Sequence, residues 1–302
     1  MTTLQLEYFK ALTKMLNVSK VAEIFYVSPP AITAAIDRLE SEIGAELFTV
    51  HGRTLALTAA GEIFSAAADD MLASLSRAKE SISYLNKSSL PPVTVGITSP
   101  ITWAALFDAF MLENPDIKLS SILLKEHQLN DPEIYGKLDF VFCSPELFYS
   151  PLFGFSPLPV DCSPCLAVYH SHPLAHRKSI RLSEVKNERF IALTAGYSYR
   201  SYFDKLCNMA GFTPNIVLEC DFSMRAAMLS AGYGILVTTK SVAQSGALGD
   251  ATFIDIIDPF YSQPHSLHAA RGYAKNPSAD KFFQYVMDYF SIDTASDKTS
   301  TN

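Results

Sequence analysis

Residues 18 to 39 read VSKVAEIFYVSPPAITAAIDRL and have the pattern of two helices joined by a tight turn. Ser19 is the predicted N-cap of the first helix, and the apolar residues after it recur at helical spacing. Ser28 can cap the second helix, and Pro29 suits its first position because that N–H has no helical partner. On spacing alone the segment is either an ordinary helical hairpin or a helix-turn-helix whose second helix enters a DNA groove.

The residues that follow favour the DNA-binding alternative. Leu47 and Phe48 precede a short stretch in which Leu55 and Leu57 alternate with small residues, as in a β-ribbon or wing. Thr58 then begins another helix. The order of helix, turn, helix and ribbon is typical of a winged helix-turn-helix.

At this point the chain resembles the LysR-type transcriptional regulators, whose N-terminal domain is a winged helix-turn-helix. A run of matches in order is a more specific signal than a single motif. The matching residues are Leu6, Phe9, Ala22, Val27, Ser28, Pro30, Ala31, Ile32, Ile36, Leu39, Glu40, Gly44, Leu47, Phe48, Arg53, Leu57, Thr58 and Gly61.

Several positions depart from the family pattern. Val50 stands where the wing usually carries a basic residue, and Pro29, Ala34 and Ala35 stand where Gln or Arg is common. Residues 1–62 contain five Lys and Arg against seven Asp and Glu, a net charge of −2. Because counterion release supplies most non-specific affinity for DNA, we expect weak binding to a single half-site and tighter binding through several subunits.

Six residues are predicted DNA contacts, with double-stranded DNA as the partner. Those for phosphates or the minor groove are basic, and those for the major groove come from the start of the second helix. For two of the basic residues, Lys20 and Arg38, the alternative is an ordinary solvated charge. The six are Lys20, Ser28, Pro30, Thr33, Arg38 and Arg53.

A heptad pattern follows the wing. Apolar residues are spaced 4, 3, 4, 3, 4, 3 over about three heptads, which predicts a long helix with one apolar seam. The seam packs either against its own domain or against a second copy of the chain; we predict the second, and the resemblance implies the same. Homodimers, and homotetramers formed through the C-terminal domains, are therefore expected. The seam residues are Phe64, Ala68, Met71, Leu75, Ala78, Ile82 and Leu85.

Beyond Pro91 and Pro92 the pattern alternates between strands and helices. This order predicts an α/β fold in two doubly wound lobes. The predicted strands are 93–98, 117–124, 138–143, 163–170, 190–194, 216–219, 234–238 and 266–272, and the predicted helices are 103–113, 199–210, 224–231 and 279–290.

The family resemblance continues through this half of the chain. It runs through Phe110, Asn114-Pro115-Asp116, Gly136-Lys137-Leu138-Asp139, His172-Pro173-Leu174-Ala175, Ala210-Gly211-Phe212 with Pro214, and Ala231-Gly232-Tyr233-Gly234-Ile235. It implies an effector-binding domain that is similar to periplasmic binding proteins. The predicted division is a winged helix-turn-helix at 1–58, a linker and dimerisation helix at 59–89, an effector-binding domain at 90–295 and a disordered tail at 296–302. Within the effector-binding domain, lobe I is 90–160 with 267–295, and lobe II is 161–266.

In such folds the ligand lies at the carboxyl ends of the strands, between the lobes. Hydroxyl and thiol side chains follow several predicted strands; each alone is often only a helix cap, so the prediction rests on their convergence. Few Lys or Arg lie at these points, which indicates recognition through hydrogen bonds, although Lys125 or Arg200 can reach in. The expected effector is a small organic acid or a similar polar metabolite. The predicted effector-binding residues are Ser99, Thr102, Cys143, Ser144, Thr194 and Ser223.

The five cysteines, Cys143, Cys162, Cys165, Cys207 and Cys220, are an odd number, which favours a reducing compartment. The single CxxC at Cys162 lacks a second ligand pair, so these thiols read as buried apolar groups. A cysteine-based redox-sensing regulator is one alternative. His170, His172 and His176 overlap the family's His-Pro-Leu-Ala turn, which favours a structural role over a metal site.

We predict no catalytic activity, no metal and no cofactor, because no GxSxG, P-loop or paired metal motif is present. With no secretory leader and no long apolar run, a soluble cytoplasmic protein without membrane contact is expected. A solute-binding protein without DNA function is a second alternative. A solute-binding protein would have the same two lobes, but this alternative does not explain the presence of residues 1 to 86.

Overall fold

The computed structural model describes residues 1–51, 54–85, 90–260 and 262–292. Internal contacts divide the chain into two compact units. The first unit holds Met1–Asn86 and Pro132–Lys137, and the second holds Lys87–Asp131 and Leu138–Asn302. Within the described residues, no helix is long and apolar enough to cross a membrane.

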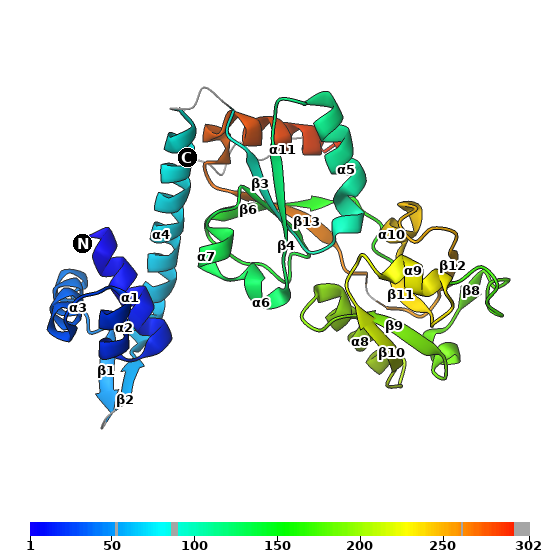
Figure 1. Cartoon of the computed structure of the whole chain (residues 1–302), viewed down its shortest axis with the longest axis horizontal. Helices are drawn as coiled ribbons and strands as arrows, with labels where there is room; N and C mark the ends of the chain where they lie inside the picture. Colours follow the sequence, from blue (N-terminus) through cyan, green and yellow to red (C-terminus); the bar gives the residue numbers. More distant parts are fainter. Residues whose placement is uncertain (52–53, 86–89, 261, 293–302) are drawn as a thin grey trace. The chain divides into compact units, whose positions relative to one another are not determined.

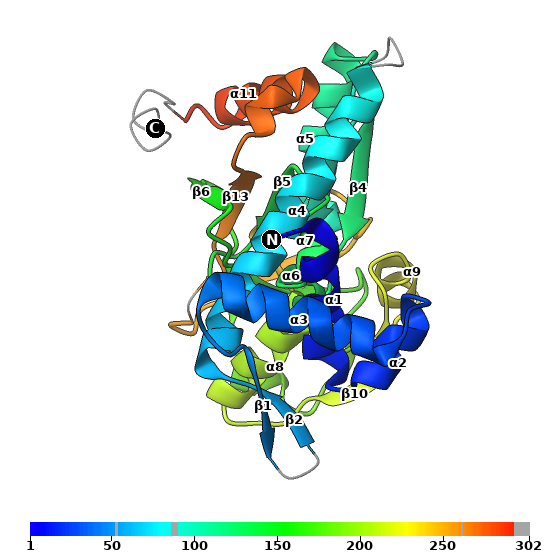
Figure 2. The same ribbon diagram turned by 90° about the vertical axis from the view of Figure 1, so that its left-hand side faces the viewer.

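The first unit combines short helices with a β-ribbon and one long helix. In Figure 2 the ribbon projects away from the packed helices, as a wing does. The predicted winged helix-turn-helix is confirmed. Its elements are α1 (Thr3–Met15), α2 (Val18–Ile24), α3 (Pro29–Ile43), β1 (Phe48–His51), β2 (Thr54–Leu57) and α4 (Ala59–Leu85), with α7 (Pro132–Tyr135) grouped in the same unit.

Local hydrogen bonds explain where these helices begin. The Asn17 side chain accepts a hydrogen bond from the Lys20 backbone N–H at 3.0 Å, so α2 starts at Val18. The prediction of Ser19 as N-cap is wrong, because Asn17 supplies the capping oxygen and Ser19 lies inside the helix. The Thr58 hydroxyl accepts from the Gly61 N–H at 2.9 Å, which fixes the start of α4 as predicted.

An apolar core holds the wing and the long helix to α1. The Phe9 ring meets Phe48 of β1 and Phe64 of α4 edge-on, with ring centroids 5.4 and 5.1 Å apart. A Cβ on Gly61 would lie 2.1 Å from the Leu47 carbonyl oxygen, so the start of α4 approaches the strand entry as only glycine allows.

A carboxylate fixes the segment that leads into the wing. Oε1 of Glu40 accepts hydrogen bonds from the backbone N–H groups of Leu47 and Phe48, at 2.6 and 3.0 Å. One charged acceptor therefore satisfies two backbone donors and ties the end of α3 to the start of β1.

The second unit contains two lobes, each with its own sheet (Figure 1). In the first lobe the strand order is β4-β3-β5-β13-β6; β3 runs parallel to β4 and β5, and β13 runs antiparallel to β5 and β6. Its elements are β3 (Val93–Ile97), α5 (Pro100–Glu113), β4 (Leu119–Leu123), α6 (Glu126–Leu129), β5 (Phe140–Cys143), β6 (Phe153–Leu158), β13 (His265–Ala270), η2 (Tyr273–Lys275) and α11 (Pro277–Tyr289).

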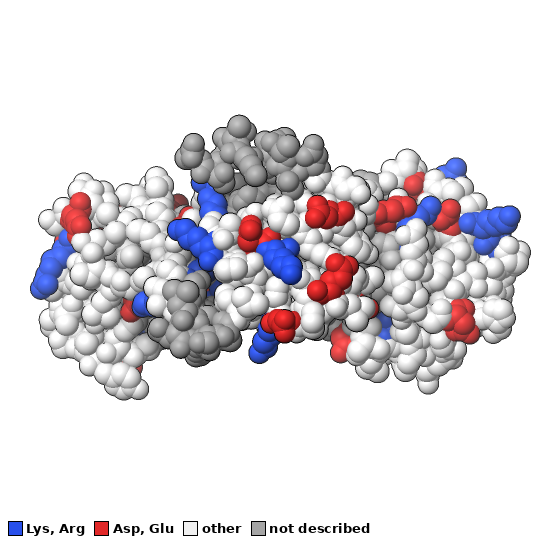
Figure 3. Space-filling view, turned by 90° about the horizontal axis from the view of Figure 1, so that it is seen from above, with Lys and Arg blue, Asp and Glu red and all other residues white. Residues whose placement is uncertain are grey.

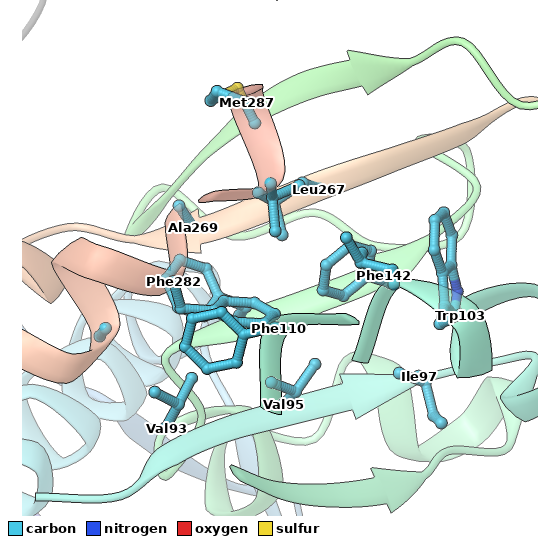
Figure 4. Packing of buried hydrophobic residues seen from close by; sticks show 14 of the residues in the cluster. Val93, Val95, Ile97, Trp103, Phe110, Phe142, Leu267, Ala269, Phe282 and Met287 are labelled. Carbon is cyan, nitrogen blue, oxygen red and sulfur yellow. The ribbon is translucent and has the colours of Figure 1, made fainter. Parts of the chain in front are cut away.

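Aromatic side chains form the core of this lobe (Figure 4). Phe282 of α11 meets Phe110 of α5 edge-on at 4.9 Å, and Trp103 packs on Phe142 of β5 at 4.6 Å between ring centroids. Both helices thus cover the sheet. Burial of a ring of this size contributes about 1.5–3 kcal/mol to the free energy of folding. This core fixes the start of α5, where Trp103 lies.

The second lobe has the strand order β11-β7-β12-β8 with a β10-β9 pair beside it. Backbone bonds from Ile191 N–H to Ile235 and from Ile235 N–H to Arg189 connect β9 to the residue just before β11. Its elements are β7 (Pro164–Val168), β8 (Ser179–Ile180), η1 (Leu182–Val185), β9 (Arg189–Leu193), α8 (Ser198–Met209), β10 (Asn215–Cys220), α9 (Arg225–Ser230), β11 (Leu236–Thr239), α10 (Lys240–Gln244) and β12 (Thr252–Ile256).

The predicted α/β class with two lobes is confirmed. Every predicted strand and helix of this half has a counterpart. The additional elements are β6, β8, β12, α6, α7, α10, η1 and η2. The chain passes from the first sheet to the second after β6 and returns before β13. The exact domain and lobe bounds stay predictions, and the predicted disordered tail at 296–302 lies outside the described residues.

Candidate functional site

One face of α3 is buried and the other is open. Ile32, Ile36 and Leu39 point into the core, as the helical spacing requires. Among the predicted DNA contacts, all those described are exposed, and Arg53 lies outside the described residues. The exposed ones are Lys20, Ser28, Pro30, Thr33 and Arg38. Their role in DNA binding stays a prediction.

The basic side chains of this unit are divided between two tasks. Lys10 binds Asp69 at 2.8 Å and Ser65 at 2.7 Å, so it ties α1 to α4. Lys20 and Arg38 form no ion pair within the described residues and remain available to phosphates. Figure 3, a view of the chain from above, shows Lys, Arg, Asp and Glu side chains scattered among uncharged residues on that face. The expectation of weak electrostatic binding per half-site rests on the net charge of −2 over residues 1–62.

Sequence reasoning missed one exposed side chain beside α3. Tyr26 lies in the turn between α2 and α3, has φ of 55° and is 95% exposed. A tyrosine hydroxyl at this turn can donate to a DNA phosphate, which makes Tyr26 a further candidate contact. No local pattern distinguishes it from an ordinary turn residue.

The structure divides the predicted seam of α4. Phe64 and Ala68 are buried in the core of their own unit, contrary to the expectation that they face a partner, because α1 and the wing cover the first turns of α4. Met71 and Leu75 are half-buried, whereas Ala78 and Ile82 are exposed, and the Leu85 side chain is outside the described residues. The later turns of α4 thus offer an apolar surface, and dimerisation through them stays a prediction.

Polar side chains of the two lobes meet at the lobe interface. The Tyr199 hydroxyl of α8 lies 2.8 Å from Nε2 of His265 on β13, and both side chains are buried. Trp103 packs edge-on against the His265 ring at 5.1 Å. A backbone bond from Glu126 N–H to Gly196 at 2.9 Å also joins the lobes. We call the following set the interface cluster: Ser99, Thr102, Trp103, Ser144, Tyr199, Thr239 and His265.

Burial keeps the central pair of the cluster neutral. Desolvation raises the pKa of Tyr199, while the nearby hydroxyls of Thr102, Thr239 and Ser99 act in the opposite direction. Burial lowers the pKa of His265 to about 4. At neutral pH the interface is therefore held by hydrogen bonds between uncharged groups.

Several buried polar groups at or beside this interface lack a hydrogen-bond partner. They are Nε1 of Trp103, Oγ of Ser144, Nδ1 of His265 and Nε of Arg225, all within the described part of the chain. A buried polar group without a partner costs about 1–3 kcal/mol. Such groups are normally satisfied by bound molecules or ordered water. The interface thus has the chemistry to bind a polar ligand.

The predicted effector-binding residues fall into two sets. Ser99 caps α5, its hydroxyl lies 2.8 Å from that of Thr102, and Ser144 directly follows Cys143 of β5. Cys143 is buried beside them, and its carbonyl accepts a hydrogen bond from the Ser266 hydroxyl at 3.0 Å. These residues come together at the interface, although their contact with a ligand stays a prediction.

Thr194 and Ser223 are exposed and bond locally. The Thr194 hydroxyl donates to the Cys220 carbonyl at 3.2 Å, and the Ser223 hydroxyl donates to Asp221 at 2.5 Å. No hydrogen bond in the described residues joins either hydroxyl to the interface cluster. A role for them in binding also stays a prediction.

The basic residues at the interface differ from those expected. Arg200 binds Asp204 at 3.0 Å and Glu219 at 2.5 Å, so its charge is already paired. The ammonium of Lys125, from the first lobe, lies 5.4 Å from the centre of the Tyr197 ring of the second lobe. Arg225, which sequence reasoning missed, is only 4% exposed.

The cysteine thiols are buried and free. Burial raises the pKa of Cys162, Cys165 and Cys207 to about 12 in each case. Because the thiolate is the reactive form, these values disfavour a cysteine-based sensor. In the described residues no group of three or more His, Cys, Asp or Glu is placed to hold a metal.

Two protein-family models match the chain, one over each unit. A family model described as "Bacterial regulatory helix-turn-helix protein, lysR family" matches residues 4–62, and one described as "LysR substrate binding domain" matches residues 92–291. The chain belongs to the LysR family. This family comprises DNA-binding transcription regulators with a C-terminal effector-binding domain, and the chain has both parts.

Individual LysR proteins match over almost the full length. The Uncharacterized HTH-type transcriptional regulator YybE of Bacillus subtilis is 31% identical, covering 95% of this chain and 98% of that protein. Transcriptional dual regulator GltC of the same organism is 24% identical, covering 95% and 97%.

Solved structures match in fold. The LysR family regulator CbnR has a TM-score of 0.56 at 22% identity, covering 96% of this chain and 99% of that chain. Full-length CbnR complexed with its target DNA has a TM-score of 0.55 at 21% identity, covering 95% and 99%. The two family models, which match one unit each, favour a regulator over a solute-binding protein without DNA function.

Proposed function

We propose that this LysR-family regulator changes its activity on DNA when a small organic acid or similar polar metabolite binds between the two lobes. The single observation that carries the effector site is the interface cluster. Both lobes contribute to it, Tyr199 and His265 join them directly, and buried polar groups there lack partners. A ligand that satisfies these groups binds the closed lobes more tightly than the open lobes, so it shifts the population toward closure.

We further propose a path from the ligand to DNA. The exposed turns of α4 pair two copies of the chain, the effector lobes assemble dimers into tetramers, and lobe closure changes the angle between paired DNA-binding units. DNA bending changes as a result. The heptad spacing, the exposure of Ala78 and Ile82, and the family membership support this order. Because the target is chromosomal DNA, we place the protein in the cytoplasm, without a membrane partner.

The test is binding of the full-length protein to its own upstream intergenic DNA, by fluorescence anisotropy over a salt series with scrambled competitor. We expect preference for the intergenic DNA and a steep fall in affinity with salt. Arg38→Ala should reduce the salt slope by about one for each bound subunit. The matched control is Lys118→Ala, which removes an exposed charge from the second unit and should leave the slope unchanged. Equal binding to scrambled DNA at low salt would contradict the proposal.

A further inference from the structure

Arg225 is a buried cation without an acidic partner. Its side chain is 4% exposed, its Nε has no hydrogen bond, and it forms no ion pair with any described residue. Burial lowers the pKa of Arg225 to about 10, so the guanidinium remains charged at neutral pH. Buried charges in proteins are normally paired, because an unpaired charge loses its hydration without compensation.

The surroundings of Arg225 supply no negative charge. The titratable groups that act on it are Cys220 and Tyr199, and burial raises the pKa of each, so both are neutral. Asp221 is the nearest acidic residue in sequence. Its carboxylate is exposed and accepts hydrogen bonds from Ser223 and Met224 instead.

Three other cations of the same lobe form ion pairs. Arg200 binds Asp204, Arg177 binds Glu184 at 3.2 Å, and Lys240 binds Asp255 at 3.2 Å. These pairs lie nearer the surface, where an unpaired cation costs little. Ion pairs in this lobe are thus formed by partly exposed cations, whereas its most deeply buried guanidinium, that of Arg225, has no acidic partner among the described residues.

Arg225 lies beside the interface between the lobes. Its guanidinium is 5.9 Å from the centre of the Phe222 ring, and Phe222 packs on Tyr197 at 5.4 Å. Tyr197 in turn faces Lys125 of the first lobe. Arg225 is also close enough to Tyr199, which reaches His265, for the two side chains to act on each other electrostatically. The cation thus lies near the region where the two lobes meet.

We propose that Arg225 is the anion receptor of this interface, and that the molecule bound between the lobes carries a carboxylate or phosphate group. This inference rests on the proposed effector site and specifies the ligand's chemistry. A planar guanidinium presents parallel N–H donors that match two oxygens of either oxyanion. The unpaired Nε1–H of Trp103 is a further donor for the polar part of the same ligand.

The first test measures thermal unfolding of the full chain with defined probes. Sodium benzoate, sodium succinate and inorganic phosphate are compared with benzamide, succinamide and NaCl at equal ionic strength. We expect at least one oxyanion to raise Tm above its neutral or chloride control. A carboxylate response and a phosphate response distinguish the two ligand sources. An equal rise with the amides, or no rise with any of the three anions, overturns the inference.

The second test needs no ligand. Arg225→Met keeps the volume but removes the charge, so without an oxyanion it should be at least as stable as the unmodified protein and should lose the anion-dependent rise. Arg225→Lys should keep part of that rise. The matched control Arg200→Met removes a paired guanidinium and should lower Tm while keeping the anion response. A lower Tm for Arg225→Met together with a retained anion response shows a structural residue instead.

DNA binding separates this inference from the proposed function. If Arg225→Met binds the intergenic DNA normally but no longer responds to the anion, both proposals are supported. If the anion stabilises the unmodified protein but leaves its DNA affinity and footprint unchanged, the anion receptor stands and the proposed regulation fails. If a neutral probe alone changes the footprint, regulation stands and the anion receptor fails.

Discussion

Acid should destabilise the first lobe through two buried histidines. Burial lowers the pKa of His265 and of His268 to about 4, against 6.5 for the exposed side chain. Between these values the unfolded chain binds more protons than the folded chain, so stability is present at neutral pH and is lost as pH falls. From pH 7 to pH 5, each histidine contributes a loss of about 2 kcal/mol.

The chain contains one tryptophan, which supplies the assay. Trp103 is fully buried in the first lobe, 5.1 Å from the His265 ring, so its emission reports the unfolding of that lobe. Both histidines together predict a loss of about 4 kcal/mol between pH 7 and pH 5. With a urea m-value of about 2 kcal/mol/M, the midpoint should fall by about 2 M.

His268→Gln separates the histidines from the carboxylates. The His268 ring accepts or donates one bond, with the Ser266 hydroxyl at 2.8 Å, and glutamine can occupy the same place without titrating. The variant should lose about half of the pH dependence. Carboxylates titrate mainly below pH 5 and contribute little in this range. Equal urea midpoints at pH 7 and pH 5, or an unchanged shift in the variant, would refute the reasoning.

Three substitutions test other parts of the structure. Tyr199→Phe removes the buried hydrogen bond between the lobes and should lower the free energy of unfolding by about 1–3 kcal/mol in the tryptophan-detected urea titration. An unchanged urea midpoint would show that this bond does not stabilise the protein. Gly61→Ala places a Cβ 2.1 Å from a backbone oxygen and should lower stability by about 1–3 kcal/mol, whereas Gly154→Ala, which opens onto free space, should have little effect by calorimetry. Ile82→Asp should weaken self-association in sedimentation velocity, but Ile63→Asp, an exposed position off the seam of the same helix, should not; equal behaviour of the two would argue against the seam.

The N-terminal unit could be predicted in detail because its signals are local. The apolar spacing of Ile32, Ile36 and Leu39 fixes one face of α3, and Thr58 marks the start of α4. The partner of the α4 seam was harder to predict, because a heptad pattern does not show whether the same chain or a second copy packs against it. Phe64 and Ala68 fit the spacing but are covered by their own unit.

The effector site depends on contacts between distant residues. Ser99, Thr102 and Ser144 follow strand ends, so a topological rule could find them. Tyr199 and His265 are 66 residues apart and belong to different lobes, so no local pattern joins them. Arg225 reads as a surface residue at the start of a short helix, and only the folded chain reveals its burial and its lack of a partner.

Because α4 is long, a small change in its tilt produces a large displacement at its other end. Its 27 residues span about 40 Å, at about 1.5 Å per residue. A tilt of about 10° at one end of such a rigid rod displaces the other end by about 7 Å, or about two base-pair steps of 3.4 Å. In the proposed path from ligand to DNA, a small rotation at the far end of α4 therefore moves α3 by a distance comparable to the spacing of base pairs.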